Sequence, residues 1–260
     1  MVENKARIVA VANEKGGVGK TVTVINLGAA LSRKGITVLV VDMDPQSNAT
    51  KGLGVELGEG NYSIYDLIKD HETIHAADTI LKTQWEGLDL IPSHIDLAGA
   101  EVELVDEMGR ENKLKQALEG ISNQYDLVLL DTPPSLSLLT INVFAYAKEI
   151  LIPCQTHPYA YAALDELFDT IFSVKREINP DIEVCGIVAT LFDQRTRVSH
   201  RILEKLKTDD RYKAFLLTTV IRTNTTIAES ADVGKPVVFY RPSSYGSIGY
   251  MNLAEELMAS

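Results

Sequence analysis

The 260-residue sequence contains only two cysteines, one tryptophan and no long apolar run. Its apolar stretches are interrupted by charges or glycines well before the roughly 20 residues that a membrane-spanning helix needs. The first residues, Met1 to Lys5, lead directly into a strand-like run and lack the basic, apolar and small-residue zones of a signal peptide. We therefore expect a cytoplasmic protein with no membrane partner.

The two cysteines, Cys154 and Cys185, each lie in an apolar stretch rich in Val and Ile. Neither belongs to a C-x-x-C pair, so the sequence does not favour a zinc or iron–sulfur site within one chain. We predict that both are buried, reduced thiols.

The charge is acidic overall and unevenly distributed. A net charge of −11 argues against a protein that coats nucleic acid over its whole surface. The segment 195–241 nevertheless has a net charge of +5, which leaves −16 for the rest of the chain. A basic region on an acidic body is expected for a local contact with a phosphate backbone, but a solvated surface of mixed charge explains these numbers equally well.

Short apolar segments alternate with segments of helical spacing along the whole chain. This βα alternation predicts an α/β fold with a doubly wound, mostly parallel sheet and helices on both faces. No repeat or long linker divides the chain, so we expect one domain over 1–260, ending in a helix near 247–258. The predicted strands are Arg7–Ala12, Thr37–Asp42, Leu88–Pro92, Leu127–Asp131, Glu149–Pro153, Glu183–Leu191 and Leu216–Ile221. Helical core stripes are predicted at Val24, Leu27 and Leu31, at Leu114, Ala117, Leu118 and Ile121, and at Leu164, Leu167, Phe168 and Ile171.

The strongest motif follows the first predicted strand and opens the next helix. It reads Glu14-Lys15-Gly16-Gly17-Val18-Gly19-Lys20-Thr21. Glycines let backbone N–H groups turn inward, and the helix N-terminus adds partial positive charge, so the segment forms a cradle for phosphates. Lys20 is placed to neutralise the β- and γ-phosphates, and the Thr21 hydroxyl is placed to bind Mg²⁺. The ordinary motif has Gly where this chain has Glu14.

Lys15 is a second lysine at the outer edge of the same loop. One lysine already serves the phosphates from inside the loop, so we expect Lys15 to point away from its own cradle. From there it would reach the phosphates of a nucleotide held by a facing copy of the chain. This interpretation predicts a dimer that depends on the γ-phosphate.

Three acidic residues follow predicted strands near the loop. Asp42 and Asp44 end the second strand, in the segment Asp42-Met43-Asp44-Pro45-Gln46, and Asp131 ends an apolar Walker B-like strand. The carboxyl ends of strands face the ligand in a doubly wound sheet. Asp44 is therefore the candidate for handling the attacking water, and Asp131 for the metal through water. Asp42 is as well explained as a structural acid at a strand end.

These motifs resemble those of the ParA/Soj partitioning ATPases of the MinD/ParA group, which have a deviant Walker A loop. The resemblance covers nearly the whole chain. It also rests on the segments Leu97-Ala98-Gly99-Ala100-Glu101, Asp131-Thr132-Pro133-Pro134-Ser135-Leu136 and Asp193-Gln194-Arg195-Thr196. It implies a slow ATPase with ATP and Mg²⁺ as cofactors, which forms a homodimer, binds non-specific duplex DNA in its ATP state and is stimulated by a ParB-like or cargo-adaptor protein.

The resemblance also implies roles for individual residues. Lys15, Lys20 and Asp44 are the expected catalytic residues, and Thr21, Asp44 and Asp131 the expected magnesium residues. The expected ATP-binding residues are Lys15, Gly16, Gly17, Val18, Gly19, Lys20, Thr21, Val22, Asp131 and, at the adenine ring, Asn224. Val22 replaces a second threonine, which removes a hydroxyl near the α-phosphate.

The expected DNA-binding residues are Arg195, Arg197 and Arg222. Close relatives read Pro-Arg-Asn-Val-Arg where this chain has Arg222-Thr223-Asn224-Thr225-Thr226. Two arginines of the DNA face are thus replaced by Thr223 and Thr226. Each lost phosphate contact lowers both the affinity and its salt dependence, so DNA binding is expected to be weaker or directed elsewhere.

Other functions use the same kind of loop. An ATP-driven reductase would need bridging cysteines near a dimer axis, and a ligase would need a pocket for a carboxylate or amine substrate; the sequence identifies neither. A MinD-like positioning ATPase on a track other than DNA is a further alternative. A binding module without turnover is disfavoured by the complete set of Lys15, Lys20, Asp44 and Asp131. Chromosome, plasmid and protein cluster remain open as the cargo.

Overall fold

The computed structural model describes residues 6–259 and contains one eight-stranded sheet. The strands are β1 (Arg7–Val11), β2 (Val38–Asp42), β3 (Leu81–Lys82), β4 (Leu88–Ile91), β5 (Leu127–Asp131), β6 (Glu149–Gln155), β7 (Glu183–Phe192) and β8 (Leu216–Arg222). Their order across the sheet is β3-β4-β2-β5-β1-β6-β7-β8. All pairs are parallel except β3 with β4, so the predicted α/β fold with a mostly parallel sheet is confirmed.

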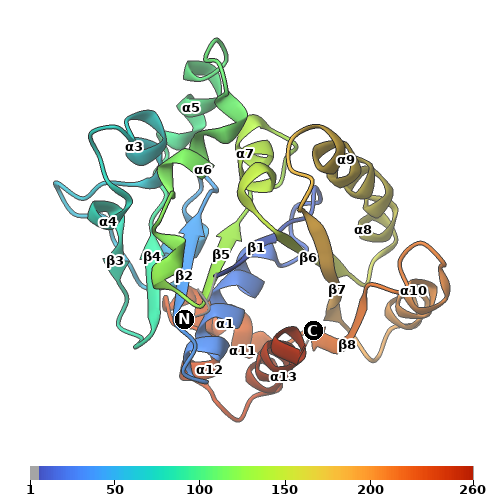
Figure 1. Ribbon diagram of the computed structural model, residues 1–260. Coiled ribbons are helices and arrows are strands. Elements are labelled where there is room, and N and C mark those ends of the chain that lie inside the picture. Colours follow the sequence, from blue (N-terminus) through green and yellow to red (C-terminus); the bar gives the residue numbers. More distant parts are fainter. Residues whose placement is uncertain (1–5, 260) are drawn as a thin grey trace.

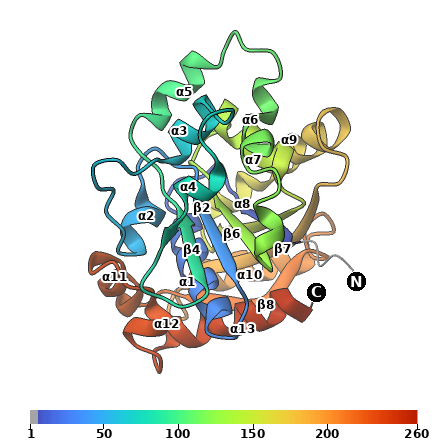
Figure 2. The same ribbon diagram turned by 60° about the vertical axis from the view of Figure 1, so that its left-hand side comes forward.

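Helices cover both faces of this sheet (Figures 1 and 2). The α-helices are α1 (Lys20–Ser32), α2 (Asn48–Gly52), α3 (Ile64–Lys69), α4 (Ala76–Thr79), α5 (Leu97–Glu103), α6 (Lys113–Ala117), α7 (Leu138–Tyr146), α8 (Pro158–Ala162), α9 (Leu164–Glu177), α10 (Arg197–Thr208), α11 (Thr225–Asp232), α12 (Val237–Tyr240) and α13 (Tyr245–Ala259). Two short 3₁₀ helices lie at Arg110–Asn112 and Ser122–Gln124.

The central strand β1 explains why the predicted strands are apolar without alternation. Ile8 and Ala10 point into a core built with α3, α5, α6, α7 and α9. Val9 and Val11 point to the opposite face, into a core built with α1, α12 and α13. Because successive side chains of a strand face opposite sides, a strand that is covered on both sides must be apolar at every position.

All seven predicted strands are present, with ends that differ by at most two residues. The missed strand, β3, has two residues and pairs antiparallel with β4 at the edge of the sheet. So short a segment leaves no apolar pattern in the sequence. The predicted C-terminal helix is present as α13, and the three predicted stripes are buried.

The helix expected through Ile121 is shorter than predicted. α6 ends at Ala117, and Gly120 has a φ of 78°, a left-handed conformation that favours glycine and turns the chain. Leu118 and Ile121 are nevertheless buried, 0% and 5% exposed. Their helical spacing therefore reports burial on one side of the chain and not a continuous helix.

The two cysteines are both free thiols, as expected. Cys154 is fully buried, whereas Cys185 is half-buried. Burial raises the pKa of each thiol to about 12, so both are protonated at neutral pH. Within residues 6–259, no helix combines the length and the apolar character that crossing a bilayer requires.

Candidate active site at the carboxyl ends of the strands

The glycine-rich loop between β1 and α1 has the conformation that a phosphate cradle needs. Gly17 and Gly19 have φ values of 76° and 92°, in the left-handed region, and Gly19 immediately precedes the first residue of α1. The α1 N-terminus therefore opens directly onto the loop and adds its partial positive charge to the inward-facing N–H groups.

Two buried side chains from outside the motif hold this loop in place. The Lys15 N–H donates to Oδ1 of Asn13 (2.9 Å), whose Nδ2 donates to the carbonyl of Pro153 in β6 (2.8 Å). The hydroxyl of Thr190 in β7 donates to the carbonyl of Val18 (2.7 Å). The loop is thus tied to two neighbouring strands. Neither side chain belongs to a sequence motif, because only the fold brings it to its partner.

The two lysines of the loop lie in different surroundings. Lys20 is 6% exposed, and its Nζ donates to the carbonyl of Lys15 at 3.4 Å. Burial lowers the pKa of Lys20, although the negative charges of Asp131 and Asp44 act in the opposite direction. Lys15 is exposed at the edge of the loop and does not line the pocket that Lys20 lines. One lysine faces the cavity of its own chain and the other faces outward.

Asp131 is fully buried, and both of its carboxylate oxygens lack a hydrogen-bond partner among the described residues. It lies opposite Asp42 in the register of β5 and β2. Burial, followed by the charge of Asp42, raises the pKa of Asp131 well above its usual range. An unpartnered buried carboxylate beside the phosphate cradle fits a divalent cation, with the Thr21 hydroxyl close enough to lower the same pKa.

No cluster of three or more His, Cys, Asp or Glu side chains suited to a metal ion exists within residues 6–259. Magnesium does not require such a cage, because it is commonly held by one or two carboxylates, phosphate oxygens and water. The residues present therefore fit Mg²⁺ bound together with a nucleotide, held by Thr21 and reached from Asp131 and Asp44.

The Asp42 carboxylate is engaged by hydrogen bonds from its own chain. Its Oδ2 accepts hydrogen bonds from the N–H (2.8 Å) and the hydroxyl (2.7 Å) of Thr50, and its Oδ1 accepts from the N–H of Asp44 (3.1 Å). Burial raises the pKa of Asp42 to about 6, although these hydrogen bonds act in the opposite direction. All of its contacts shape the loop that carries Asp44.

Asp44 is the acid of this loop that reaches the cavity. It is 7% exposed and lines the pocket, while its Oδ1 accepts from the N–H of Gln46 at 2.9 Å. That hydrogen bond fixes the carboxylate beside Lys20 and engages only one of its two oxygens. A carboxylate held in this way can orient a water molecule at the phosphates.

The cavity at this edge of the sheet has a volume of about 660 Å³. This is the size of a nucleotide-scale pocket. The predicted residues that line it are Gly16, Gly17, Gly19, Lys20, Thr21, Val22, Asp44, Asn224 and Arg222. Val18, Asp131 and Lys15 do not line it: Val18 and Asp131 are buried beneath it, and Lys15 lies outside.

The end of the cavity away from the loop is mostly apolar. Ile227, Ala228 and Ala231 of α11 form one wall, and Leu191 lies at the end of β7. Asn224 precedes α11 and caps it, with its Oδ1 accepting from the N–H of Thr226 at 2.8 Å. Asn224 lines the cavity, and this hydrogen bond engages its side-chain oxygen and not its amide nitrogen.

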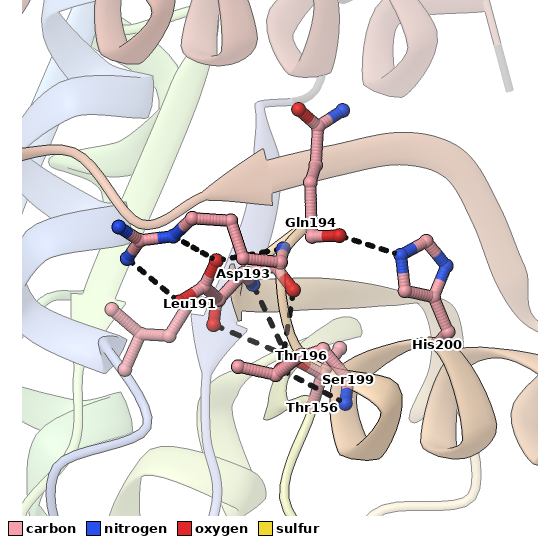
Figure 3. Close-up of polar contacts among 8 residues, drawn as sticks. Thr156, Leu191, Asp193, Gln194, Thr196, Ser199 and His200 are labelled. Carbon is pink, nitrogen blue, oxygen red and sulfur yellow. Dashed lines mark hydrogen bonds and ion pairs between the residues drawn. The ribbon is translucent and has the colours of Figure 1, made fainter.

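The turn after β7, which Figure 3 shows with Asp193, Gln194 and Thr196 labelled, leads into α10. Two of the three arginines predicted to contact DNA lie in this turn and at the start of that helix. Arg195 forms a double hydrogen bond with Asp193, at 3.0 and 2.9 Å, and its side chain is 86% exposed. Thr196 caps α10 by accepting from the N–H of Ser199. Arg197 is exposed at the first position of α10. The third arginine, Arg222, is at the end of β8 and lines the cavity.

Comparison with known proteins relates this arrangement to one family. A family model described as AAA domain matches residues 6–184. The sporulation initiation inhibitor protein Soj of Bacillus subtilis is 42% identical, over 98% of this chain and 99% of Soj. The chromosome partitioning protein ParA of Myxococcus xanthus is 39% identical, over 97% of this chain and 88% of that protein.

Solved structures give the same fold. Cobyrinic acid a,c-diamide synthase from Mycobacterium smegmatis, with bound ADP and magnesium, has a TM-score of 0.82 and 35% identity over 97% of this chain and 94% of that one. The ATP complex of a Cyanothece McdA variant has a TM-score of 0.87 over 98% of this chain and 97% of that chain. At 22% identity, the second likeness bears on the fold alone.

Proposed function

Because the chain belongs to the ParA and Soj family of partitioning ATPases, we propose that it is an ATP-dependent dimer switch that positions a chromosome, a plasmid or a protein cluster. Its cofactors are ATP and Mg²⁺, in line with the ADP and magnesium bound by its structural relative. Slow hydrolysis of ATP to ADP and phosphate returns the dimer to monomers.

The exposure of Lys15 beside a buried Lys20 carries this proposal. Lys20 lines the cavity of its own chain and neutralises the phosphates there. Lys15 is exposed at the loop's outer edge and does not line that cavity. A facing copy of the chain would bring its γ-phosphate to this lysine, so dimerisation would depend on ATP and not on ADP.

Different residues of the chain have different roles in the hydrolysis. Lys20 and the loop N–H groups hold the phosphates, and Asp44 orients the attacking water. Bound Mg²⁺ supplies positive charge at the phosphate oxygens. Asp44 is the general-base candidate, because it is the acid near Lys20 that reaches the cavity.

Duplex DNA is the proposed track of the ATP-bound dimer. Arg195 and Arg197 are exposed on the turn before α10 and at its first position, within the basic part of an acidic chain. Dimerisation doubles the positive surface of one subunit. Thr223 and Thr226 stand where close relatives have arginines, and Thr226 is only 8% exposed. The affinity for DNA would therefore depend on the turn that carries Arg195.

A salt titration of DNA binding with ATP and with ADP tests this function. If the dimer makes about five phosphate contacts, log affinity should fall against log salt with a slope of roughly −4 to −5, and the ADP-bound monomer should show about half that slope. Arg195→Glu should weaken DNA binding and leave dimerisation unchanged. Equal binding in both nucleotide states, or no binding by the ATP dimer at low salt, would rule out DNA as the track.

The stimulating partner is proposed to be a ParB-like protein or a cargo adaptor, and the protein is proposed to act in the cytoplasm at the nucleoid. The likeness to the diamide synthase supports an ATP-driven ligase as a second candidate. Measuring ATP consumption distinguishes these two candidate functions. A partitioning ATPase hydrolyses ATP with no second substrate and responds to DNA, whereas a ligase consumes ATP only with a carboxylate substrate and an amine donor.

A further inference from the structure

Arg222 lies at the rim of the nucleotide cavity and not on the exposed turn with Arg195. It is the last residue of β8, in register with Phe192 of β7, and it lines the cavity together with Leu191. No ion pair of Arg222 is found among residues 6–259, so its charge is not neutralised by a described carboxylate.

Two neighbours hold the plane of the Arg222 guanidinium. One face lies over the ring of Tyr245, with 5.5 Å between the guanidinium carbon and the ring centroid. With the Gln194 amide turned so that its oxygen faces Arg222, that oxygen accepts from Nη1 and Nη2, both at 3.2 Å. A guanidinium that is held over a ring and hydrogen-bonded at its edge loses little freedom when a ligand binds it.

The part of the cavity next to Arg222 is lined by side chains that suit a purine. Ile227, Ala228 and Ala231 line it with apolar surface. The amide nitrogen of Asn224 is a donor that the described residues do not use, because the capping bond engages only its oxygen. Apolar walls with one donor at the edge suit a flat heteroaromatic ring that carries acceptor nitrogens.

We propose that Arg222 is a base-stacking residue: its guanidinium covers one face of the purine of the bound nucleotide, with Tyr245 behind it. Arginine stacks on aromatic faces through its planar, weakly hydrated cation. Tyr245 and Gln194 act as positioning residues that keep the guanidinium in this plane. The inference deepens the nucleotide site of the proposed function and does not depend on DNA binding.

Paired binding measurements on the full chain test this role. ADP carries a base, and inorganic tripolyphosphate carries phosphates without one. Arg222→Ala and Arg222→Lys should each weaken ADP binding by about 5- to 30-fold, because a lysine keeps the charge but not the plane. Neither substitution should change the affinity for tripolyphosphate by more than about twofold.

Arg241→Ala is the matched control, because Arg241 also lies over a tyrosine ring, that of Tyr240, but does not line the cavity. It should bind ADP as the parent does. If an Arg222 variant does not fold, Tyr245→Ala supplies the same test, with ADP binding weakened and tripolyphosphate binding unchanged.

Three results would overturn the proposal. Unchanged ADP affinity in Arg222→Ala would remove the contact with the base. Parental ADP affinity in Arg222→Lys would show that charge and not stacking matters, and an equal loss for tripolyphosphate would assign Arg222 to the phosphates.

If ADP binding is unchanged while the salt slope of DNA binding falls by about 2, Arg222 belongs to the DNA surface, with one phosphate for each subunit. A parent that fails to dimerise or to bind DNA would refute the proposed function and leave the ADP comparison valid.

Discussion

At the scale of single residues, the main feature of the site is Asp131, a buried carboxylate without a hydrogen-bond partner among the described residues. Its pKa is higher in the folded protein than in the unfolded chain, because burial and the charge of Asp42 oppose ionisation. The metal-free fold therefore holds this proton more tightly. Its free energy of unfolding should decrease as the pH rises from the ordinary Asp range toward the raised pKa.

We predict that Asp131→Asn stabilises the protein without nucleotide or metal. At pH 8 the gain should be roughly 1–3 kcal/mol, because a buried carboxyl group whose ionisation is opposed by burial and by Asp42 is removed. This corresponds to a rise in melting temperature of about 2–12 °C. Thermal unfolding in EDTA at pH 5 and pH 8 measures the effect, and the parent should lose more stability than the variant between these values.

Asp42 is present in both proteins, and its charge acts on Asp131, so the difference between them reports the buried pair of carboxyls. Added Mg²⁺ with ADP should raise the melting temperature of the parent more than that of the variant. Equal melting temperatures of the two proteins at pH 8 in EDTA would show that Asp131 is not an unpaired charge.

The sequence predicts much of this site because the loop and its acids are contiguous motifs at strand ends. Lys20, Thr21 and Asp44 line the cavity as expected. Asn13 and Thr190 were missed because their roles depend on distant carbonyls. Asn13 bonds to Pro153, 140 residues away along the chain, and Thr190 bonds to Val18, 172 residues away. No local pattern encodes such pairs.

At the scale of elements, the end of β7 links the nucleotide cavity to the turn that carries Arg195. Leu191 has a φ of 48°, which is unusual for a residue other than glycine, and its side chain is 38% exposed at the cavity. The hydroxyl of Thr156 donates to the Leu191 carbonyl (3.4 Å) and contacts Ser199 of α10 (3.1 Å), as Figure 3 shows. The surrounding contacts thus hold a strained residue in place.

We predict that Leu191→Gly is more stable than Leu191→Ala. Both substitutions remove the same side-chain contacts beyond Cβ, but only alanine keeps the steric penalty of the left-handed conformation. The difference should be about 1 kcal/mol in the free energy of unfolding, or about 2–4 °C in melting temperature. If the alanine variant melts at the same temperature or higher, Leu191 is not strained in solution.

The elements themselves are predictable where hydrophobic patterning is strong. The seven apolar strands were predicted because a sheet covered on both faces requires apolar side chains at every position. β3 was not predicted, since a two-residue edge strand has no pattern. α6 is shorter than its stripe of buried residues, because Gly120 turns the chain.

At the scale of the whole molecule, charge opposes association of two copies. Each chain has a net charge of −11, so a dimer brings together two acidic bodies. Two bound ATP molecules would add further negative charge at the interface. A cation that reaches across it is therefore the feature most needed, and Lys15 is exposed at the edge of the loop. Dimerisation should weaken strongly when this one charge is removed.

The role of Lys15 across a dimer is tested by the mass in solution of the parent and of Lys15→Gln, measured by light scattering with ADP and with a non-hydrolysable ATP analogue. The parent should have the monomer mass of 28.6 kDa with ADP and about twice that mass with the analogue. The variant should bind ADP with parental affinity and remain a monomer in both nucleotides. Lys20→Ala serves as the control, because it should lose nucleotide binding altogether. A Lys15→Gln protein that still doubles its mass with the analogue would contradict the claim that Lys15 acts across a dimer.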